Sequence, residues 1–239
     1  MDSYKVWDIE QRIEGNPYVG RGIVLGKTPD GRHGVAAYFI MGRSKNSRNR
    51  IFVERDGALF TEPFDAAAVE DPSLIIYAAA RRYENRLIVT NGDQTDTVYE
   101  GLSAGKSFHE ALQTRAFEPD APNFTPRISG MMTLDNGDCT YEMSILKSVD
   151  AHGSACQRFT FSYPSVAGLG HFLHTYVGDG NPLPPFFGEP ERVKTCDDID
   201  AFSERLWNAL NEDNRISLYV CYTDLKSGAT STTLFNKNR

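Results

Sequence analysis

The feature that most constrains the fold of this chain is a series of short apolar segments separated by strong turn signals. Thr28-Pro29-Asp30-Gly31 and Asp135-Asn136-Gly137-Asp138 contain residues that fix a backbone dihedral or tolerate a positive φ, and each lies between two apolar segments. Turns of this kind join antiparallel strands, so both predict β-hairpins. The expected strands are residues 20–25, 35–41, 86–90, 128–134, 140–147, 157–163, 216–222 and 231–235.

Two segments have the pattern of amphipathic helices. Ser107 and Glu110 form a capping-box pattern ahead of the first, and Asp197 with Asp198 precedes the second. A short third helix is expected within residues 64–76, ahead of Asp71-Pro72. The apolar residues at helical spacing are Phe108, Ala111, Leu112 and Ala116 in the first helix, and Ile199, Phe202, Leu206 and Leu210 in the second.

The order of these elements is strands, helix, strands, helix, strands. Strict alternation of strand and helix is absent from the pattern, so a doubly wound parallel sheet is disfavoured. We predict an α+β fold in which helices cover mostly antiparallel sheets. The chain has 239 residues, 40% of them hydrophobic, and we expect it to form a single domain, residues 1–239.

Composition also bears on the cellular setting. No apolar run reaches the roughly 20 residues of a membrane helix, and the N-terminal segment has neither a secretory apolar core nor an Arg-rich transit pattern. We therefore expect a cytoplasmic protein without a membrane partner. His171 and His174 lack acidic neighbours, so we expect no metal site. The cysteines are scattered, and we expect reduced thiols at Cys139, Cys156, Cys196 and Cys221.

The formal net charge of −7 argues against general binding of nucleic acid. One segment, residues 42–50, nevertheless carries four cations and no acid: Arg43, Lys45, Arg48 and Arg50. Arginine donates two parallel hydrogen bonds to a phosphate, and the intervening Ser and Asn residues add neutral donors. The segment therefore indicates an anion site, with a solvated loop as the alternative. An RNA contact is less well supported, because no aromatic residue is interleaved with the cations.

Four short motifs, taken in order, resemble those of the archaeal-type IMP cyclohydrolases. Tyr18-Val19-Gly20-Arg21, with Gly26-Lys27 and Ala37-Tyr38, is similar to the family's N-terminal block. Arg43-Ser44 and Asn49-Arg50 resemble its Ser-Arg-Ser and Asn-Arg segment, with a small insertion between the two pairs. The other two motifs are Asn91-Gly92-Asp93-Gln94-Thr95-Asp96, which resembles Asn-Gly-Ser-His-Thr-Asp, and Thr125-Pro126-Arg127-Ile128, which resembles Thr-Pro-Arg-Ile.

The resemblance is strongest over residues 18–132, whereas residues 178–184 look like the longer C-terminal half of bacterial members. It implies a fold similar to the Ntn-hydrolases, a four-layer αββα sandwich of mostly antiparallel sheets. It also implies a reaction, the dehydrative closure of 5-formamidoimidazole-4-carboxamide ribonucleotide to IMP in purine biosynthesis. Nothing is oxidised in that reaction, so no redox cofactor or metal is expected. The implied partner is a purine ribonucleotide monophosphate, and homo-oligomerisation is left open.

The resemblance further implies roles for particular residues. Tyr77 is expected to donate to the formyl oxygen or to relay a proton, Glu118 to shuttle a proton if burial raises its pKa, and Arg43 to lie over the base or the developing oxyanion. The residues expected to bind the substrate are Arg21, Ser44, Asn49, Arg50, Asn91, Thr95, Asp96 and Arg127.

Each of these assignments has a plain alternative. Tyr77 would otherwise be a core tyrosine with a bonded hydroxyl, and Glu118 a surface acid. Residues 91–96 would form a capped turn, and Arg127 would pair with Asp96.

Two other functions remain open. One is a nucleotide-binding protein that kept the fold and the phosphate site without the chemistry. Gln94 in place of the family's His, and the insertion near Lys45, favour it. The other is an amide hydrolase that acts on a related substrate.

Overall fold

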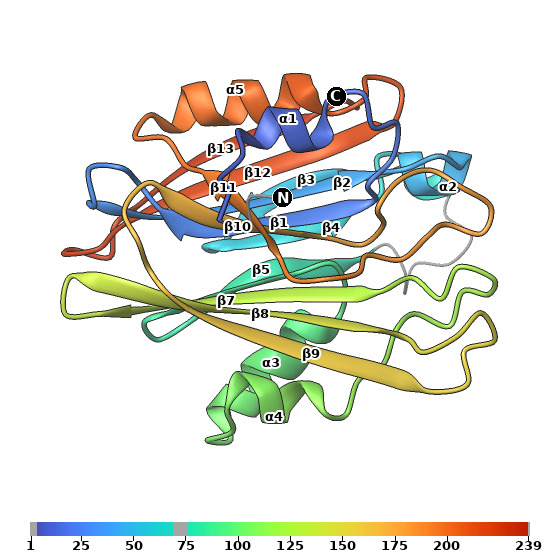
Figure 1. Cartoon of the computed structure of the whole chain (residues 1–239), viewed down its shortest axis with the longest axis horizontal. Helices are drawn as coiled ribbons and strands as arrows, with labels where there is room; N and C mark the ends of the chain where they lie inside the picture. Colours follow the sequence, from blue (N-terminus) through green and yellow to red (C-terminus); the bar gives the residue numbers. More distant parts are fainter. Residues whose placement is uncertain (1–3, 69–75, 239) are drawn as a thin grey trace.

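The computed structural model describes residues 4–68 and 76–238 and contains two β-sheets stacked face to face (Figure 1). All strand pairings within the two sheets are antiparallel. The six-stranded sheet has the order β11 (Glu191–Lys194), β10 (Leu169–His174), β1 (Arg21–Lys27), β2 (His33–Met41), β12 (Arg215–Asp224) and β13 (Thr230–Asn236). The seven-stranded sheet runs from β3 (Ile51–Arg55) through β4 (Ala58–Glu62), β5 (Tyr77–Tyr83), β6 (Arg86–Thr90), β7 (Arg127–Asp135) and β8 (Asp138–Ser148) to β9 (Cys156–Pro164).

Helices lie on the outer faces of both sheets (Figure 1). α1 (Ile9–Ile13) and α5 (Ile199–Ala209) cover the six-stranded sheet, and Phe202 and Leu206 of α5 are fully buried against it. α3 (Gln94–Ser103) and α4 (Phe108–Leu112) cover the seven-stranded sheet. The largest apolar cluster lies between the two sheets, where alternate residues of most strands meet. The mixed fold of mostly antiparallel sheets that the sequence predicts is therefore confirmed.

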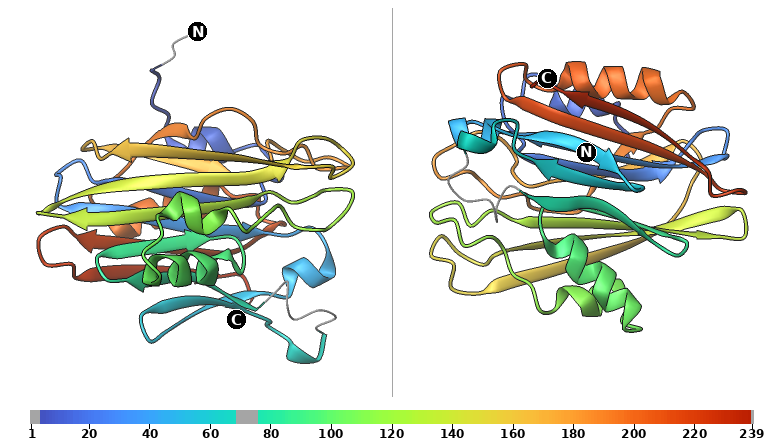
Figure 2. Two further views of the ribbon diagram at one scale, coloured as in Figure 1. Left: turned by 90° about the horizontal axis from the view of Figure 1, so that it is seen from below. Right: turned by 180° about the vertical axis from the view of Figure 1, so that it is seen from behind.

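The β3–β4 hairpin joins the two sheets at one edge. Figure 2 shows it beside β12 and β13 of the opposite sheet. The Asn236 side chain accepts a hydrogen bond from Phe52 N at 2.8 Å and donates one to Phe52 O at 2.9 Å. Since α2 (Lys45–Arg48) and Arg50 come directly before β3, this clamp also fixes their position.

All eight expected strands are present, with bounds that differ by no more than two residues. The first expected helix is α4, but it ends at Leu112, so the expectation that Ala116 lies on its apolar face is wrong: Ala116 follows the helix and is exposed. The second is α5. Within residues 64–76 the structure contains a short 3-10 helix, Ala66–Ala68, and Asp71-Pro72 lies outside the described residues.

Several elements are not among those expected from the sequence: α1, α2, α3, β3, β4, β5, β10 and β11. β5 is the most instructive, because its sequence, YAAARRY, consists largely of residues that favour helices. Pairing with β4 and β6 and burial of its alanines between the sheets override that local preference.

Two further expectations concern the cysteines and the membrane. Cys139, Cys156, Cys196 and Cys221 are all free thiols, as the sequence predicts. Within residues 4–68 and 76–238, no helix has the length and apolar character required to cross a membrane.

The start of α5 allows a test of local stability. One carboxylate oxygen of Asp198 accepts hydrogen bonds from Asp200 N at 2.9 Å and Ala201 N at 3.0 Å. We expect Asp198→Ala to lower the free energy of unfolding by about 0.5–2 kcal/mol, measured by urea denaturation, because these two amides lose their acceptor. Asp198→Asn keeps an acceptor and should retain most of the stability. Equal losses for the two variants would contradict a capping role.

Candidate active site

Two neighbouring cavities lie at one end of the space between the sheets. The first has a volume of about 270 Å³, and its walls come from β1, α2, residues 118–125 and the segment that contains Tyr176 and Leu183. The second has about 180 Å³ and is lined by Tyr77, residues 91–93, Pro119 and Arg127. Glu118 lines both, so the two cavities meet at its side chain.

The strand framework directs two arginines into the first cavity. Arg21 begins β1 and shares a face with Ile23 and Leu25, which belong to the core between the sheets. The residue before it must be glycine: Gly20 has φ +77°, and a Cβ there would lie 2.1 Å from Thr175 Oγ1. Arg50 stands just before β3 and exposes only 6% of its surface.

Both guanidinium groups are buried without a bonded anion. Among the described residues, the Nε atoms of Arg21 and Arg50 have no hydrogen-bond partner, and neither side chain belongs to an ion pair. Burial lowers the pKa of Arg50, and repulsion from Arg21 lowers it further. Burial also opposes the charge of Arg21, but the Glu118 carboxylate and the hydroxyl groups of Tyr18, Tyr77 and Tyr176 together more than offset this, and the pKa of Arg21 is raised. Two buried cations that face a single carboxylate favour the binding of an additional anion.

Glu118 is held between these cations by its backbone. Its N–H donates to Thr125 O at 2.9 Å, which closes the turn of residues 118–125. Burial raises the pKa of the Glu118 carboxyl, and Asp120 raises it further, while Arg21, Arg127 and Arg50 oppose the shift. A raised pKa makes a carboxyl group a better proton acceptor than an ordinary glutamate, which suits a group that takes up and returns a proton.

Tyr77 lies at the wall of the second cavity, and its hydroxyl is 3.0 Å from the hydroxyl of Tyr38. Tyr38 is fully buried, and its ring stacks on Phe52 with centroids 5.3 Å apart. Burial raises the pKa of Tyr38 well above its usual value, and the neighbouring Tyr77 adds to the shift. Tyr38 therefore stays protonated and is able to donate to Tyr77, a pairing that the sequence analysis does not include among the site residues.

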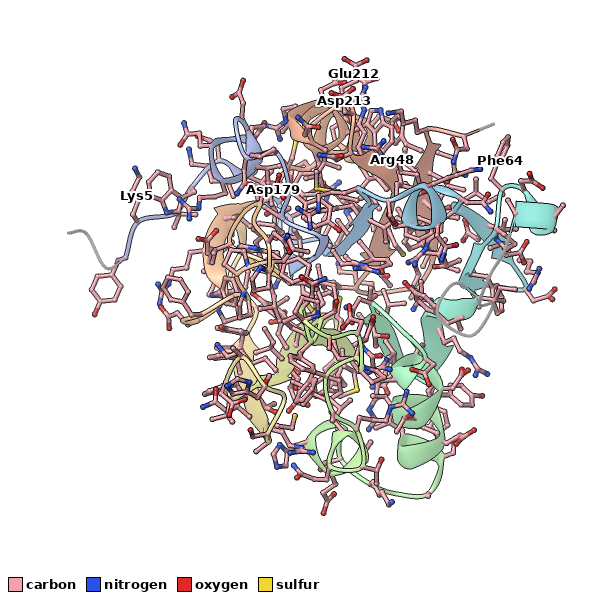
Figure 3. The ribbon with its side chains drawn as sticks, turned by 90° about the vertical axis from the view of Figure 1, so that its right-hand side faces the viewer. Lys5, Arg48, Phe64, Asp179, Glu212 and Asp213 are labelled. Carbon is pink, nitrogen blue, oxygen red and sulfur yellow. The ribbon has the colours of Figure 1, made fainter. Side chains whose placement is uncertain are left out.

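Residues 42–50 contain the short helix α2 and do not form the solvated loop that is the alternative expectation. Ser44 caps α2, and its hydroxyl accepts a hydrogen bond from Ser47 N at 3.1 Å. Arg43 pairs with Asp179, donates to Gly180 O at 3.0 Å, and lies 5.1 Å from the Tyr18 ring centroid. Figure 3 views the molecule from the side that carries Asp179. Arg43 and Ser44 both line the first cavity.

The remaining predicted site residues divide between the cavity wall and its supports. Asn91 lines the second cavity, but its amide is occupied, because it donates to Pro126 O and accepts from Ile128 N, both at 2.9 Å. The Thr95 hydroxyl lies 2.7 Å from the Thr90 hydroxyl beneath the start of α3.

Asn49 and Asp96 face other surroundings. The Asn49 amide bonds to Asp65 N and O at 2.7 and 2.8 Å, and Asn49 lines neither cavity. Asp96 pairs with Arg81 at 2.6 Å and lines a separate, larger pocket on the other side of Tyr77.

The alternative that Arg127 pairs with Asp96 is wrong. Arg127 instead donates to Asp93 Oδ1 and to Gln94 Oε1, both at 2.6 Å. Asp93 and Gln94 stand at the start of α3, opposite the first residue of β7, whereas Asp96 is further along the helix and faces β5.

Sequence reasoning also omits Tyr18, Asp120, Thr125 and Tyr176, which line the first cavity. The Thr125 hydroxyl is 2.6 Å from Tyr176 Oη and also donates to Asp120. Thr125 was visible within the Thr-Pro-Arg-Ile-like motif, but Tyr176 is distant in sequence and belongs to no matched segment. Its position depends on the fold.

His171 and His174 have structural partners, and the expectation that His174 lacks an acidic neighbour is wrong, because its Nε2 lies 4.0 Å from a carboxylate oxygen of Glu191. His171 Nδ1 is 2.8 Å from Tyr141 Oη, and His174 Nδ1 is 2.7 Å from Tyr176 O. Within the described ranges, no group of three or more His, Cys, Asp or Glu side chains is arranged to hold a metal ion.

The sequence of the chain places it in a known class of protein. The sequence pattern of the IMP cyclohydrolase-like protein family matches residues 18–228. The chain therefore belongs to the IMP cyclohydrolase-like family.

Its relatives include archaeal proteins named IMP cyclohydrolase. The protein from Methanopyrus kandleri is 40% identical over 116 residues, which cover 47% of this chain and 57% of that protein. Those from Haloarcula marismortui and Natronomonas pharaonis are 35% and 36% identical over 127 and 129 residues, each 52% of this chain and 58% and 61% of the relative. The matches thus span less than two thirds of the length of these relatives.

The raised pKa of Glu118 predicts a pH dependence of stability. The folded protein binds the carboxyl proton of Glu118 more tightly than the unfolded chain does. The stability that this proton provides is therefore lost as the pH rises from 4.5, the usual pKa of glutamate, through the raised pKa of the folded state. We expect Glu118→Gln to gain stability relative to wild type as pH increases across this window, measured by urea denaturation at several pH values.

The matched control is Glu204→Gln, at an exposed position of α5. Its difference from wild type should stay constant over the same pH range. A constant difference for Glu118→Gln as well would mean that burial does not perturb this carboxyl group.

Proposed function

We propose that this chain catalyses the closure of 5-formamidoimidazole-4-carboxamide ribonucleotide to IMP, a step of purine biosynthesis. The observation that carries the proposal is the buried pair Arg21 and Arg50, without a bonded anion in the described structure, beside Glu118 where two cavities meet. The cation pair suits a dianionic phosphate, and the carboxyl suits proton transfer. The name that the archaeal relatives carry agrees with this chemistry.

The cavities suggest how the nucleotide lies. Its phosphate occupies the first cavity, against Arg21 and Arg50, with Ser44 and Arg43 at the same wall. The imidazole with its two reacting arms extends past Glu118 toward Tyr77 and the second cavity. Both arms belong to the same molecule, so binding lowers the barrier by restricting the rotations that turn the arms apart and by holding them face to face.

The reaction requires two proton movements and one stabilised oxygen. The carboxamide nitrogen attacks the formyl carbon, and Tyr77 donates a hydrogen bond to the formyl oxygen as it gains charge. Glu118 takes one proton from the attacking nitrogen and passes it to the formyl oxygen, which becomes a hydroxyl. The C–O bond then breaks as the formamido nitrogen gives up its proton to form the ring C=N bond, and Glu118 passes this second proton to the departing hydroxyl, which leaves as water. Tyr38 donates to Tyr77 and holds its hydroxyl toward the substrate. Atoms balance without an oxidant, a reductant or an external nucleophile.

The other predicted site residues take supporting roles in this scheme. Arg43 lies over the ring or the oxyanion once substrate competes with Asp179 for it. Asn91 and Arg127 form the wall beside the base. Thr95, Asp96 and Asn49 act on the substrate through the segments that they hold in place.

We extend the proposal to the fold and the cellular setting. Helices on the outer faces of two stacked sheets support a four-layer, Ntn-hydrolase-like sandwich formed by residues 1–239 as one domain. The negative net charge and the enclosed arginines support a cytoplasmic enzyme of a small nucleotide rather than a nucleic-acid or membrane partner.

One observation favours a rival, a protein that binds the nucleotide without turning it over. Gln94, which replaces a histidine of the family's motif, is fully buried, and its amide bonds to Asn91 Oδ1 at 2.9 Å and to Ile128 O at 3.2 Å. A residue so engaged has no proton to exchange with substrate.

Turnover separates the two functions. We expect purified protein to convert the formamido nucleotide to IMP, followed by absorbance, without added metal or redox cofactor. Tyr77→Phe and Glu118→Gln should each lower kcat by roughly 10²–10⁴ with KM nearly unchanged, since each removes a group that acts in the transition state.

The control variant is His109→Ala, at an exposed position of α4. If both site variants turn over substrate as fast as this control, the active site lies elsewhere. Binding of IMP without any turnover by wild type would favour the rival, and release of the formyl group by hydrolysis would favour an amide hydrolase.

If Arg50 contacts the phosphate, replacing it should affect binding of a nucleotide more than binding of the nucleoside. We expect Arg50→Ala to weaken binding of IMP by about 1.5–3 kcal/mol, the scale of a hydrogen bond to a charged group, and to change binding of inosine much less. Calorimetry measures both, with Lys45→Ala on the preceding helix α2 as the charge-matched control. Equal losses for IMP and inosine would show that Arg50 does not contact the phosphate.

A further inference from the structure

A second cationic pocket lies on the other side of α2 from the first cavity. It has a volume of about 430 Å³, within the range of small-molecule sites. Its lining includes Arg48 from α2, Arg215 from the start of β12 and Lys237 from the end of β13. Asp213 also lines this pocket, and Figure 3 labels Arg48, Asp213 and the adjacent Glu212.

The three cations are held in place by neutral groups more than by acids. Arg215 donates to Trp207 O at 2.8 Å, and its guanidinium carbon lies 4.6 Å from the Trp207 ring centroid. The Lys237 ammonium donates to the backbone oxygens of Glu212 and Asp213 at 2.7 and 3.1 Å. Because carbonyl oxygens satisfy donors without cancelling charge, the positive charge remains available to a ligand.

Few acids oppose this charge. Asp213 is the acid in the pocket lining, and the Glu212 carboxylate is 4.0 Å from Arg215. Arg48 donates to Gly42 O at 3.0 Å and to Asn214 Oδ1 at 2.8 Å, both neutral acceptors. A chain with a net charge of −7 thus carries here a pocket with three cations from three separate elements.

The pocket shares its wall with the first cavity. Asn46 and Ser47 of α2 line the first cavity, whereas the next residue, Arg48, lines the cationic pocket. Asn238, which also lines the cationic pocket, donates to Arg48 O at 2.7 Å and to Arg50 O at 3.4 Å. A ligand that moved Arg48 or Asn238 would therefore also move the backbone that carries Arg50.

We propose that this pocket is a second anion site, which binds a phosphate-bearing small molecule and is coupled to the first cavity through α2. The phosphate is held by Arg48, Arg215 and Lys237, while Ile216 provides an apolar wall against the rest of the ligand. The binding site stands on its own geometry; the coupling to IMP rests on the proposed function.

Binding is tested by calorimetry in protein that carries Arg50→Ala, which removes one of the two arginines that hold phosphate in the first cavity and so weakens binding there. The probes are inorganic pyrophosphate and ATP. We expect saturable binding of at least one probe. Adding Arg48→Gln and Lys237→Ala should weaken it about tenfold or more, because two charged donors are lost. Adding Lys45→Ala instead removes a charge from α2 outside both the first cavity and the cationic pocket, and it should leave the affinity for the probe unchanged.

The two probes identify the source of the phosphate. Equal affinities mean that the pocket reads the phosphates alone, whereas tighter binding of ATP means that it also holds the nucleoside. The absence of saturable binding by both probes, or affinities unaffected by Arg48→Gln with Lys237→Ala, would overturn the proposal. None of these readings requires turnover, so they hold even if ring closure is not observed.

Coupling is measured in protein with Arg50 intact. We measure how much saturating pyrophosphate changes the affinity for IMP in wild type and in the Arg48→Gln, Lys237→Ala variant. Competition at the first cavity affects both proteins equally, so it does not contribute to the difference between them. We expect the two changes in affinity to differ by about fivefold or more. The same change in both proteins would overturn the coupling.

Discussion

The arrangement of the site depends on the cost of burying two arginines without bonded anions. Arg21 and Arg50 come from different sheets, and each has a buried Nε without a partner among the described residues. Such burial is unfavourable unless the surroundings enforce it. Here they do, because β1 is a central strand of its sheet and the Asn236 clamp fixes the start of β3. The packing of the two sheets thus maintains a positive cavity that an anion would stabilise.

Much of the fold was predictable from the sequence, and three of the missed strands share one cause. The hairpin joining β7 and β8 follows from Asn136 and Gly137, which both adopt positive φ. β5 could not be predicted, because its alanines favour a helix until neighbouring strands pair with them. The short strands β10 and β11 likewise depend on partners far away in sequence. Local sequence patterns identify elements that are stable on their own, whereas these strands form only when other strands pair with them.

The candidate site shows the same division. The family resemblance leads to Arg21, Arg50, Tyr77 and Glu118, which the fold brings to the two adjoining cavities. Residues within one motif nevertheless separate: Asn91 faces the second cavity, whereas Asp96, one helical turn further, faces another pocket. Spacing along the chain does not reveal this, because the turn into α3 decides which side chains point inward. Tyr38 lies within a matched motif, but its contact with Tyr77 depends on the packing of the two sheets, and Tyr176 belongs to no matched segment.

The contact between the Tyr38 and Tyr77 hydroxyls has a mechanical consequence. Tyr38 belongs to β2 of one sheet and Tyr77 to β5 of the other, so the 3.0 Å distance between their oxygens is set by the thickness of the core. Well-packed interiors resist compression and transmit strain. Substitutions that swell or thin the core far from the cavities would alter this distance as surely as changes beside it. The apolar residues between the sheets thus determine how closely the Tyr38 hydroxyl approaches the Tyr77 hydroxyl.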